Sequence, residues 1–324
     1  MNIDDKLATP HESRERLQED IVMEPRQPDH TSKDIEKQSL DPLPPAQIPS
    51  APSAPSVSSL SSIHPTPKTQ SHLSTYHRAQ TYLAAEISTT HTDLLLLCCC
   101  FISGLVDSTI YDAFGTFVSM QTGNTVFLGL GSSTPHNTSK PYGWAKSFVS
   151  LVCFALGCFS FSHSTRLLGN LRRGTLALSF GVQAILVFIA AAVVQGGVAN
   201  GNINTITDDI DWWEVLPIAF LSFQSAGQIV GSRALSLAEI PTVVLTSLIH
   251  DLTTDRMLLA KPRENVKRNR RAAGFFCLLG GSVAGGWIAE GTERMQIPLW
   301  IAGGIKVGIA IAWALWPAKK RSPV

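Results

Sequence analysis

Six long apolar runs fill most of the chain between residues 94 and 316, and they constrain the fold more than any other feature. A helix needs about 20 apolar residues to cross the hydrocarbon core of a bilayer. The runs are residues 94–114, 147–168, 175–199, 215–235, 272–290 and 297–316. Backbone polar groups in lipid must be bonded within the segment, so such spans form helices. We therefore predict an all-α membrane protein with six transmembrane helices.

The remaining segments are polar and flank this membrane domain, which we place at residues 93–317. Residues 1–71 are rich in serine and proline and hold too little apolar surface to offset the entropy of folding, so we predict a disordered tail. Residues 72–92 lack proline and carry apolar side chains at roughly helical spacing. They fit either an amphipathic juxtamembrane helix or a plain linker. Residues 318–324 form a basic C-terminus.

The charges of the loops predict the orientation of the helices, because cytoplasmic loops are enriched in Lys and Arg. With the tail inside, thirteen basic residues fall on the inner side, in the second and fourth loops and the C-terminus. The outer loops hold only Lys140, Lys146 and Arg294, and a glycosylation sequon begins at Asn137 in the first of them. We therefore predict that both termini are cytoplasmic. The pattern does not identify the membrane.

Two shorter apolar segments, residues 116–131 and 240–252, each follow the first span of a set of three. Irregular backbone at membrane depth occurs only inside protein or against water, so both fit half-helices or re-entrant loops. Ordinary helices at the membrane surface are the alternative. Because each set has three spans, the second would be inverted relative to the first. Inverted repeats with short interrupted segments at matching positions indicate a transport site near the midplane.

The stretch 104–129 carries acids and amides inside an apolar region. An ionisable group in hydrocarbon costs a few kcal/mol, so it usually has a partner or lines a wet cavity. Asp107 lies mid-span, where it would bind a cation or carry a proton, or else form a structural ion pair with Arg233 or Lys306. Asp112 lies near the span end, as a second coupling group or a solvated acid. The coupling candidates are therefore Asp107 and Asp112.

A Thr-Gly-Asn-Thr sequence follows at residues 122–125. Free N–H groups at the start of a half-helix, with hydroxyls and an amide, suit an anion or carboxylate. N-capping uses the same chemistry without a ligand.

Gln224 and Gln228 share one helix face and either line a cavity or bond between helices. The predicted substrate-binding residues are Asp107, Gln121, Thr122, Gly123, Asn124, Thr125, Gln224, Gln228 and Thr246.

The spacing Gly-x-x-Asp followed by Phe-Val-x-x-x-Thr-Gly-Asn-Thr resembles the signature of the YoaK family, small integral membrane proteins with a domain of unknown function. The matching residues are Gly104, Asp107, Phe117, Val118, Thr122, Gly123, Asn124 and Thr125. In the second half, residues 222–226 stand where the family usually has Gly-Leu-Gln-Asn-Ala, and Ser247 replaces the glycine of a second Thr-Gly. The resemblance covers about residues 94–316 and implies a six-helix membrane fold, without a substrate or catalytic residue.

Other classes of protein find little support in the sequence. A net charge of +1 does not indicate nucleic-acid binding. The six cysteines lie in apolar runs without metal-ligand spacing, and no HExxH, P-loop or GxSxG sequence occurs. We therefore predict no metal, no cofactor and no enzymatic activity, and an intramembrane enzyme ranks last among the hypotheses.

We favour a secondary transporter or permease for a small solute, coupled to a proton or cation through Asp107. The alternative is an accessory membrane protein that binds partner membrane proteins and moves nothing, with its polar residues bonding helix to helix. The partners implied are the lipid bilayer and an unidentified small solute. A homo-oligomer is left open.

Overall fold

The structure is a computed structural model, and it describes residues 77–133, 143–201, 211–237, 240 and 245–319. The predicted tail at residues 1–71 and the sequon at Asn137 lie outside the described residues.

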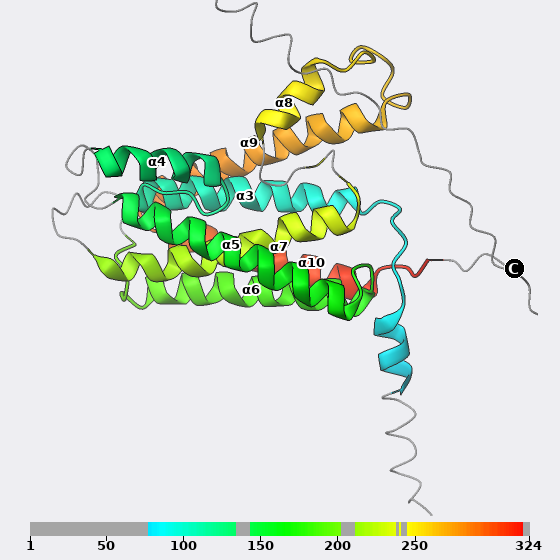
Figure 1. The fold of residues 1–324 in the computed structure, drawn as a ribbon, viewed down its shortest axis with the longest axis horizontal. Helices are drawn as coiled ribbons and strands as arrows, with labels where there is room; N and C mark the ends of the chain where they lie inside the picture. Colours follow the sequence, from blue (N-terminus) through cyan, green and yellow to red (C-terminus); the bar gives the residue numbers. More distant parts are fainter. Residues whose placement is uncertain (1–76, 134–142, 202–210, 238–239, 241–244, 320–324) are drawn as a thin grey trace, which may run out of the picture. The chain divides into compact units, whose positions relative to one another are not determined.

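Six helices of the described part are long and apolar enough to cross a membrane (Figure 1). They are α3 (Asp93–Phe114), α5 (Gly143–Leu168), α6 (Arg173–Gln195), α7 (Val215–Ala234), α9 (Val266–Thr292) and α10 (Gln296–Leu315). A short 3-10 helix, η1 (Trp212–Glu214), leads into α7. Each long helix overlaps one predicted span, so the prediction of an all-α, six-helix membrane protein is confirmed.

The two short segments are also helical, as α4 (Gln121–Ser133) and α8 (Leu245–Thr253). α3 ends at Gly115, whose φ of 70° lies in the left-handed region that glycine adopts without strain. The chain then doubles back, because the backbone N–H groups of Val118 and Ser119 bond to Asp107, about two turns before the end of α3. α4 therefore starts two residues after a contact with Asp107 rather than beyond the end of α3. We call residues 115–120 the break.

The helices pack in a two-fold pattern. α3 packs on α9, α5 on α7, and α6 on α10, while α4 packs on α5 and α8 on α9. Let each helix of α3–α6 exchange places with its counterpart in α7–α10, taken in order. The α3–α9 contact then becomes the α7–α5 contact, the α4–α5 contact becomes the α8–α9 contact, and the α6–α10 contact becomes itself. The spacing agrees, since α9 starts 123 residues after α5 (143 to 266) and α10 starts 123 residues after α6 (173 to 296). The two halves of the described bundle thus pack in equivalent ways.

Burial divides the six long helices into inner and outer ones. α3 and α7 are the most buried, whereas α5 and α9 are the least buried. The exposed faces of the outer helices carry large apolar side chains such as Phe159, Phe276 and Trp287. A face of this kind is stable against lipid rather than water, which is consistent with a membrane-embedded bundle.

The two ends of the membrane domain meet at one end of the bundle. Residues 77–84 are helical, and the Arg173 guanidinium at the start of α6 lies 3.9 Å from the ring centre of Tyr82. Further along, the Ser88 N–H donates to the carbonyl of Pro317 at 2.9 Å, and the Ser88 carbonyl accepts from the indole of Trp316 at 2.9 Å. We call this contact the strap. The strap places both ends of the membrane domain at the same end of the bundle, as an even number of crossings requires. That this end is cytoplasmic stays a prediction.

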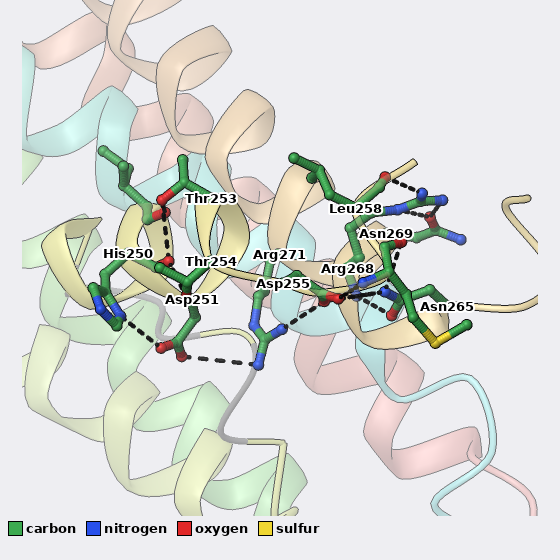
Figure 2. A network of polar contacts seen from close by, with 12 residues as sticks. His250, Asp251, Thr253, Thr254, Asp255, Leu258, Asn265, Arg268, Asn269 and Arg271 are labelled. Carbon is green, nitrogen blue, oxygen red and sulfur yellow. Dashed lines mark hydrogen bonds and ion pairs between the residues drawn. The ribbon is translucent and has the colours of Figure 1, made fainter. Parts of the chain in front are cut away.

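The loop between α8 and α9 is fixed to α9 by polar contacts (Figure 2). The carboxylate of Asp255 accepts from the side-chain amide of Asn265 at 3.0 Å and from the Met257 N–H at 2.8 Å, and it pairs with Arg271 at 3.3 Å. Asn265 also caps α9, since its side-chain oxygen accepts from the Arg268 N–H at 3.0 Å. The bond from Asn265, and then that from Met257, lowers the pKa of Asp255 below its usual value.

The lowered pKa gives the first prediction. A carboxyl group with a lowered folded-state pKa contributes stability above its unfolded pKa, and that contribution is lost as pH falls through the folded value. We expect Asp255→Asn to melt below the wild type near neutral pH, and the difference to shrink as the pH falls below about 4. Thermal unfolding in detergent measures this. A melting difference that is independent of pH would contradict the assignment.

α3 and α9 approach each other closely enough for backbone contact. A Cβ on Gly104 would lie 2.0 Å from the carbonyl oxygen of Leu278, and one on Gly281 would lie 2.0 Å from that of Phe101. Small residues permit such close approach of helices in membranes. Neighbouring Gly280 has nothing within 4 Å of the same position.

The second prediction compares these adjacent glycines. Gly281→Ala should destabilise the protein by about 1–3 kcal/mol, since its methyl group must push two backbones apart. Gly280→Ala should leave stability unchanged or raise it by about 1 kcal/mol through helix propensity. Tryptophan-fluorescence melting in detergent measures both. Equal effects at the two positions would show that α3 and α9 do not cross there.

Candidate functional site

The break needs partners for its backbone, because unbonded N–H and C=O groups inside a membrane protein are costly. Asp107 supplies two of them, since its Oδ1 accepts from the N–H groups of Val118 at 2.8 Å and Ser119 at 2.9 Å. Its Oδ2 accepts from the Ser119 hydroxyl. Asp107 is only 1% exposed. Its carboxylate therefore holds the break against α3.

Asn124, the asparagine of the Thr-Gly-Asn-Thr sequence, bonds the other side of the break. Its Oδ1 accepts from the Phe117 N–H at 3.0 Å and from the Thr116 hydroxyl at 2.9 Å. Its Nδ2 donates to the Phe117 carbonyl at 2.7 Å, to Ser150 Oγ at 2.9 Å and to Gln121 Oε1 at 2.9 Å. The side chain thus has partners at both its oxygen and its nitrogen.

Serines from α5 and α7 complete the contacts of the break, and they were not among the residues predicted from the sequence. Ser150 Oγ donates to the Phe117 carbonyl at 2.8 Å and lies 2.8 Å from Ser222 Oγ. Ser225 Oγ donates to the Val118 carbonyl at 2.9 Å. Their spacing could have indicated them, because Ser222 and Ser225 lie three apart on one helix face. The break network is Asp107, Thr116, Ser119, Gln121, Asn124, Ser147, Ser150, Ser222 and Ser225.

The other predicted residues of this region do not join the network. Thr122 and Thr125 are exposed, and the Thr125 hydroxyl donates to the Gln121 carbonyl within α4. Gly123 makes room for an aromatic ring, since a Cβ there would lie 2.8 Å from the ring of Phe117. Asp112 near the end of α3 and Thr246 on α8 are both exposed as well. The structure therefore brings together only part of the predicted binding set.

The ion pairs considered for Asp107 do not form within the described part of the chain. Arg233 is exposed in the last turn of α7. Lys306 of α10 is 0% exposed, and its Nζ donates to Gln183 Oε1 of α6 at 2.7 Å. With the Gln228 amide in the orientation that satisfies both its ends, Gln228 Oε1 accepts from the same ammonium at 3.0 Å. We call Lys306, Gln183 and Gln228 the lysine cluster.

Gln224 lies on α7 one turn before the lysine cluster. It is 1% exposed, and its Nε2 donates to the Leu221 carbonyl at 3.0 Å. Its Oε1 is buried and has no hydrogen-bond partner among the described residues. Leaving a buried acceptor unbonded costs about 1–3 kcal/mol. A buried acceptor without a partner is a feature that a bound water or ligand would explain.

A hollow of about 290 Å³ lies between α5, α6 and α7. Its walls are mainly apolar and include Phe161, Leu178 and Phe223, together with the hydroxyl of Ser179. Ser179 Oγ accepts from Gln183 Nε2 at 3.3 Å, and Gln183 in turn bonds Lys306. The hollow is thus two hydrogen bonds away from the buried ammonium.

The third prediction separates the charge of Asp107 from its hydrogen bonds. Asp107→Asn keeps an oxygen for the Val118 and Ser119 N–H groups, so we expect the protein to fold and melt near the wild type. Asp107→Leu leaves both N–H groups buried and unbonded, at about 1–3 kcal/mol each, so it should melt well below the wild type. Melting curves in detergent test this. If the asparagine variant unfolds as readily as the leucine one, the charge itself holds the break.

Comparison with known proteins places the chain in a family without giving it an activity. No curated protein and no solved structure matches it. Residues 95–312 match the family described as "Protein of unknown function (DUF1275)", which covers well over half of the chain and agrees with the resemblance to YoaK proteins. The six spans, the break and the two short helices, α4 and α8, all lie within or overlap the matched region. The chain belongs to the DUF1275 family of membrane proteins.

Proposed function

We propose that this protein is a permease that moves a small solute with a polar end across the membrane, and that Lys306 is its coupling group. The observation that carries this proposal is the equivalent packing of the two halves, α3–α6 and α7–α10. Each half contains three long helices, so the second half runs through the membrane in the opposite sense to the first. Inverted repeats of this kind support alternating access in secondary transporters.

The half-helices support the same proposal. α4 and α8 follow the first long helix of their halves and lie toward opposite ends of the long helices in Figure 1. α8 starts 124 residues after α4 (121 to 245), close to the spacing of the long helices. Interrupted segments at matching places in two halves are typical of transporters whose site lies between the repeats.

The lysine cluster lies where such a site is expected. Gln183 and Lys306 are separated by 123 residues, the same spacing as α6 and α10, so they occupy equivalent positions and meet each other. Two equivalent positions that contact each other lie near the axis that relates the two halves, and a site at the repeat interface is typical of such transporters. No carboxylate lies within 4.0 Å of the Lys306 ammonium in the described part of the chain, and both its bonded partners are amide oxygens.

This arrangement favours an anionic or strongly polar solute. A buried ammonium without a counter-ion is expensive in a membrane, and an incoming carboxylate or phosphate would replace the amide oxygens with a full charge. Gln224 Oε1, one turn before Gln228 on α7 and without a partner in the described part of the chain, offers an acceptor for a hydroxyl or N–H of the same solute. Asp107 is less suited to coupling, because its two oxygens are occupied by the break.

One observation favours the alternative, an accessory membrane protein that moves nothing. The side chains of Asp107 and Asn124 form hydrogen bonds with the backbone of the break. Such contacts stabilise a fixed structure and need no ligand. Stoichiometric crosslinking to one membrane partner, with no flux, would support this second function.

The fourth prediction tests the permease. Purified protein is reconstituted in liposomes and screened for counterflow of small carboxylates, inorganic phosphate and other small polar solutes, with a pH-sensitive dye inside. We expect flux of at least one solute with the wild type. Lys306→Met should lower that flux by about tenfold or more and remove its pH dependence, since a buried ionic contact contributes at least 1.4 kcal/mol.

The controls separate folding from coupling. Lys261→Met removes an exposed lysine from the α8–α9 loop and should leave flux unchanged. Asp107→Asn should also retain flux. Melting curves establish that each variant is folded, and a neutral side chain at a buried lysine position is compatible with folding. Folded wild type without flux across the whole panel would overturn the permease, and unchanged flux in Lys306→Met would overturn the coupling role.

A further inference from the structure

A second hollow, of about 340 Å³, opens between α5 and α7 at the end of the bundle that carries the strap. Arg166 and Asn170 line it from the α5 side, and Arg233 lines it from α7. Ile229 and Val230 of α7 form its apolar part, one turn before Arg233. The hollow therefore combines two guanidinium groups with an apolar wall.

Among the described residues, the two arginines differ from others at the same end of the bundle in having no acidic partner. Arg270 pairs with Asp93 at 3.0 Å, and Arg271 pairs with Asp255 at 3.3 Å. Neither Arg166 nor Arg233 has a carboxylate within 4.0 Å among the residues that the structure describes.

The positions of Arg166 and Arg233 explain in part how their positive charges are stabilised. Each lies in the last turn of its helix, where a cation interacts favourably with the helix dipole. The end of a helix carries only about half a charge, so two guanidinium groups retain net positive charge in the hollow. The charge remains available to an anion that enters from solvent or from the bilayer.

We propose that this hollow binds the phosphate headgroup of an anionic phospholipid. Guanidinium groups bind phosphate oxygens through paired, charge-assisted hydrogen bonds. The Asn170 amide adds a donor, while Ile229 and Val230 offer an apolar surface for the first carbons of the acyl chains. The loop charges predict that this end faces the cytoplasm, where anionic lipids concentrate. The proposal is independent of transport.

The site is tested with the full-length, delipidated protein in a neutral detergent. Phosphatidic acid, phosphatidylglycerol and phosphatidylcholine are titrated separately, and bound lipid is counted by native mass spectrometry. We expect saturable binding of the anionic lipids and weak binding of phosphatidylcholine. Arg166→Gln with Arg233→Gln should weaken anionic binding by about tenfold or more, because the charge-assisted hydrogen bonds to the phosphate are lost.

The matched control removes two exposed arginines of the α8–α9 loop, Arg256→Gln with Arg263→Gln, and should bind within about twofold of the wild type. An equal loss in both double variants would show attraction by general charge and overturn the site. Unchanged binding in the Arg166 and Arg233 variant would overturn it too. Inorganic phosphate forms the last arm: phosphate binding that depends on these arginines, without lipid binding, would replace the lipid by a soluble anion.

Discussion

The structure depends on one constraint, that the backbone of the break must be hydrogen-bonded inside a membrane bundle. Six residues between α3 and α4 leave the helical conformation, and Thr116, Val118 and Ser119 among them are buried inside the bundle. Their N–H and C=O groups are bonded by a carboxylate from α3, an amide from α4, and hydroxyls from α5 and α7. The polar side chains are therefore part of the scaffold, and the positions of four helices are set by a few residues without regular structure.

The same constraint explains why the sequence located the polar stretch but did not define its role. An acid in an apolar run is equally expected for a ligand and for a structural partner, since both compensate the same desolvation cost. Asp107 is occupied by two N–H groups and a hydroxyl that follow it in the chain, and only a chain that doubles back brings them within reach. The spans were predictable because apolar length alone determines them.

The role of the Thr-Gly-Asn-Thr residues follows from the helical phase of α4, which the sequence did not reveal. α4 begins at Gln121, so Gln121 and Asn124 share one face and turn toward the break. Thr122 and Thr125 then fall on an adjacent, exposed face. Lys306 was recognised only as a partner for Asp107, because its contact with Gln183 joins helices that are far apart in the chain. Tertiary contacts of this kind have no local signal.

The strap has a consequence for how the protein is made. Ser88 precedes all six long helices in the chain, whereas Trp316 and Pro317 follow the last of them. Their contact can form only after all six helices have been synthesised and inserted, and the bundle must already hold the ends together because closing so long a loop is entropically costly. A chain that stops before α10 leaves the Ser88 backbone without these partners. The strap thus distinguishes a complete membrane domain from one that lacks its last helix, by a contact at the residue that precedes the first helix.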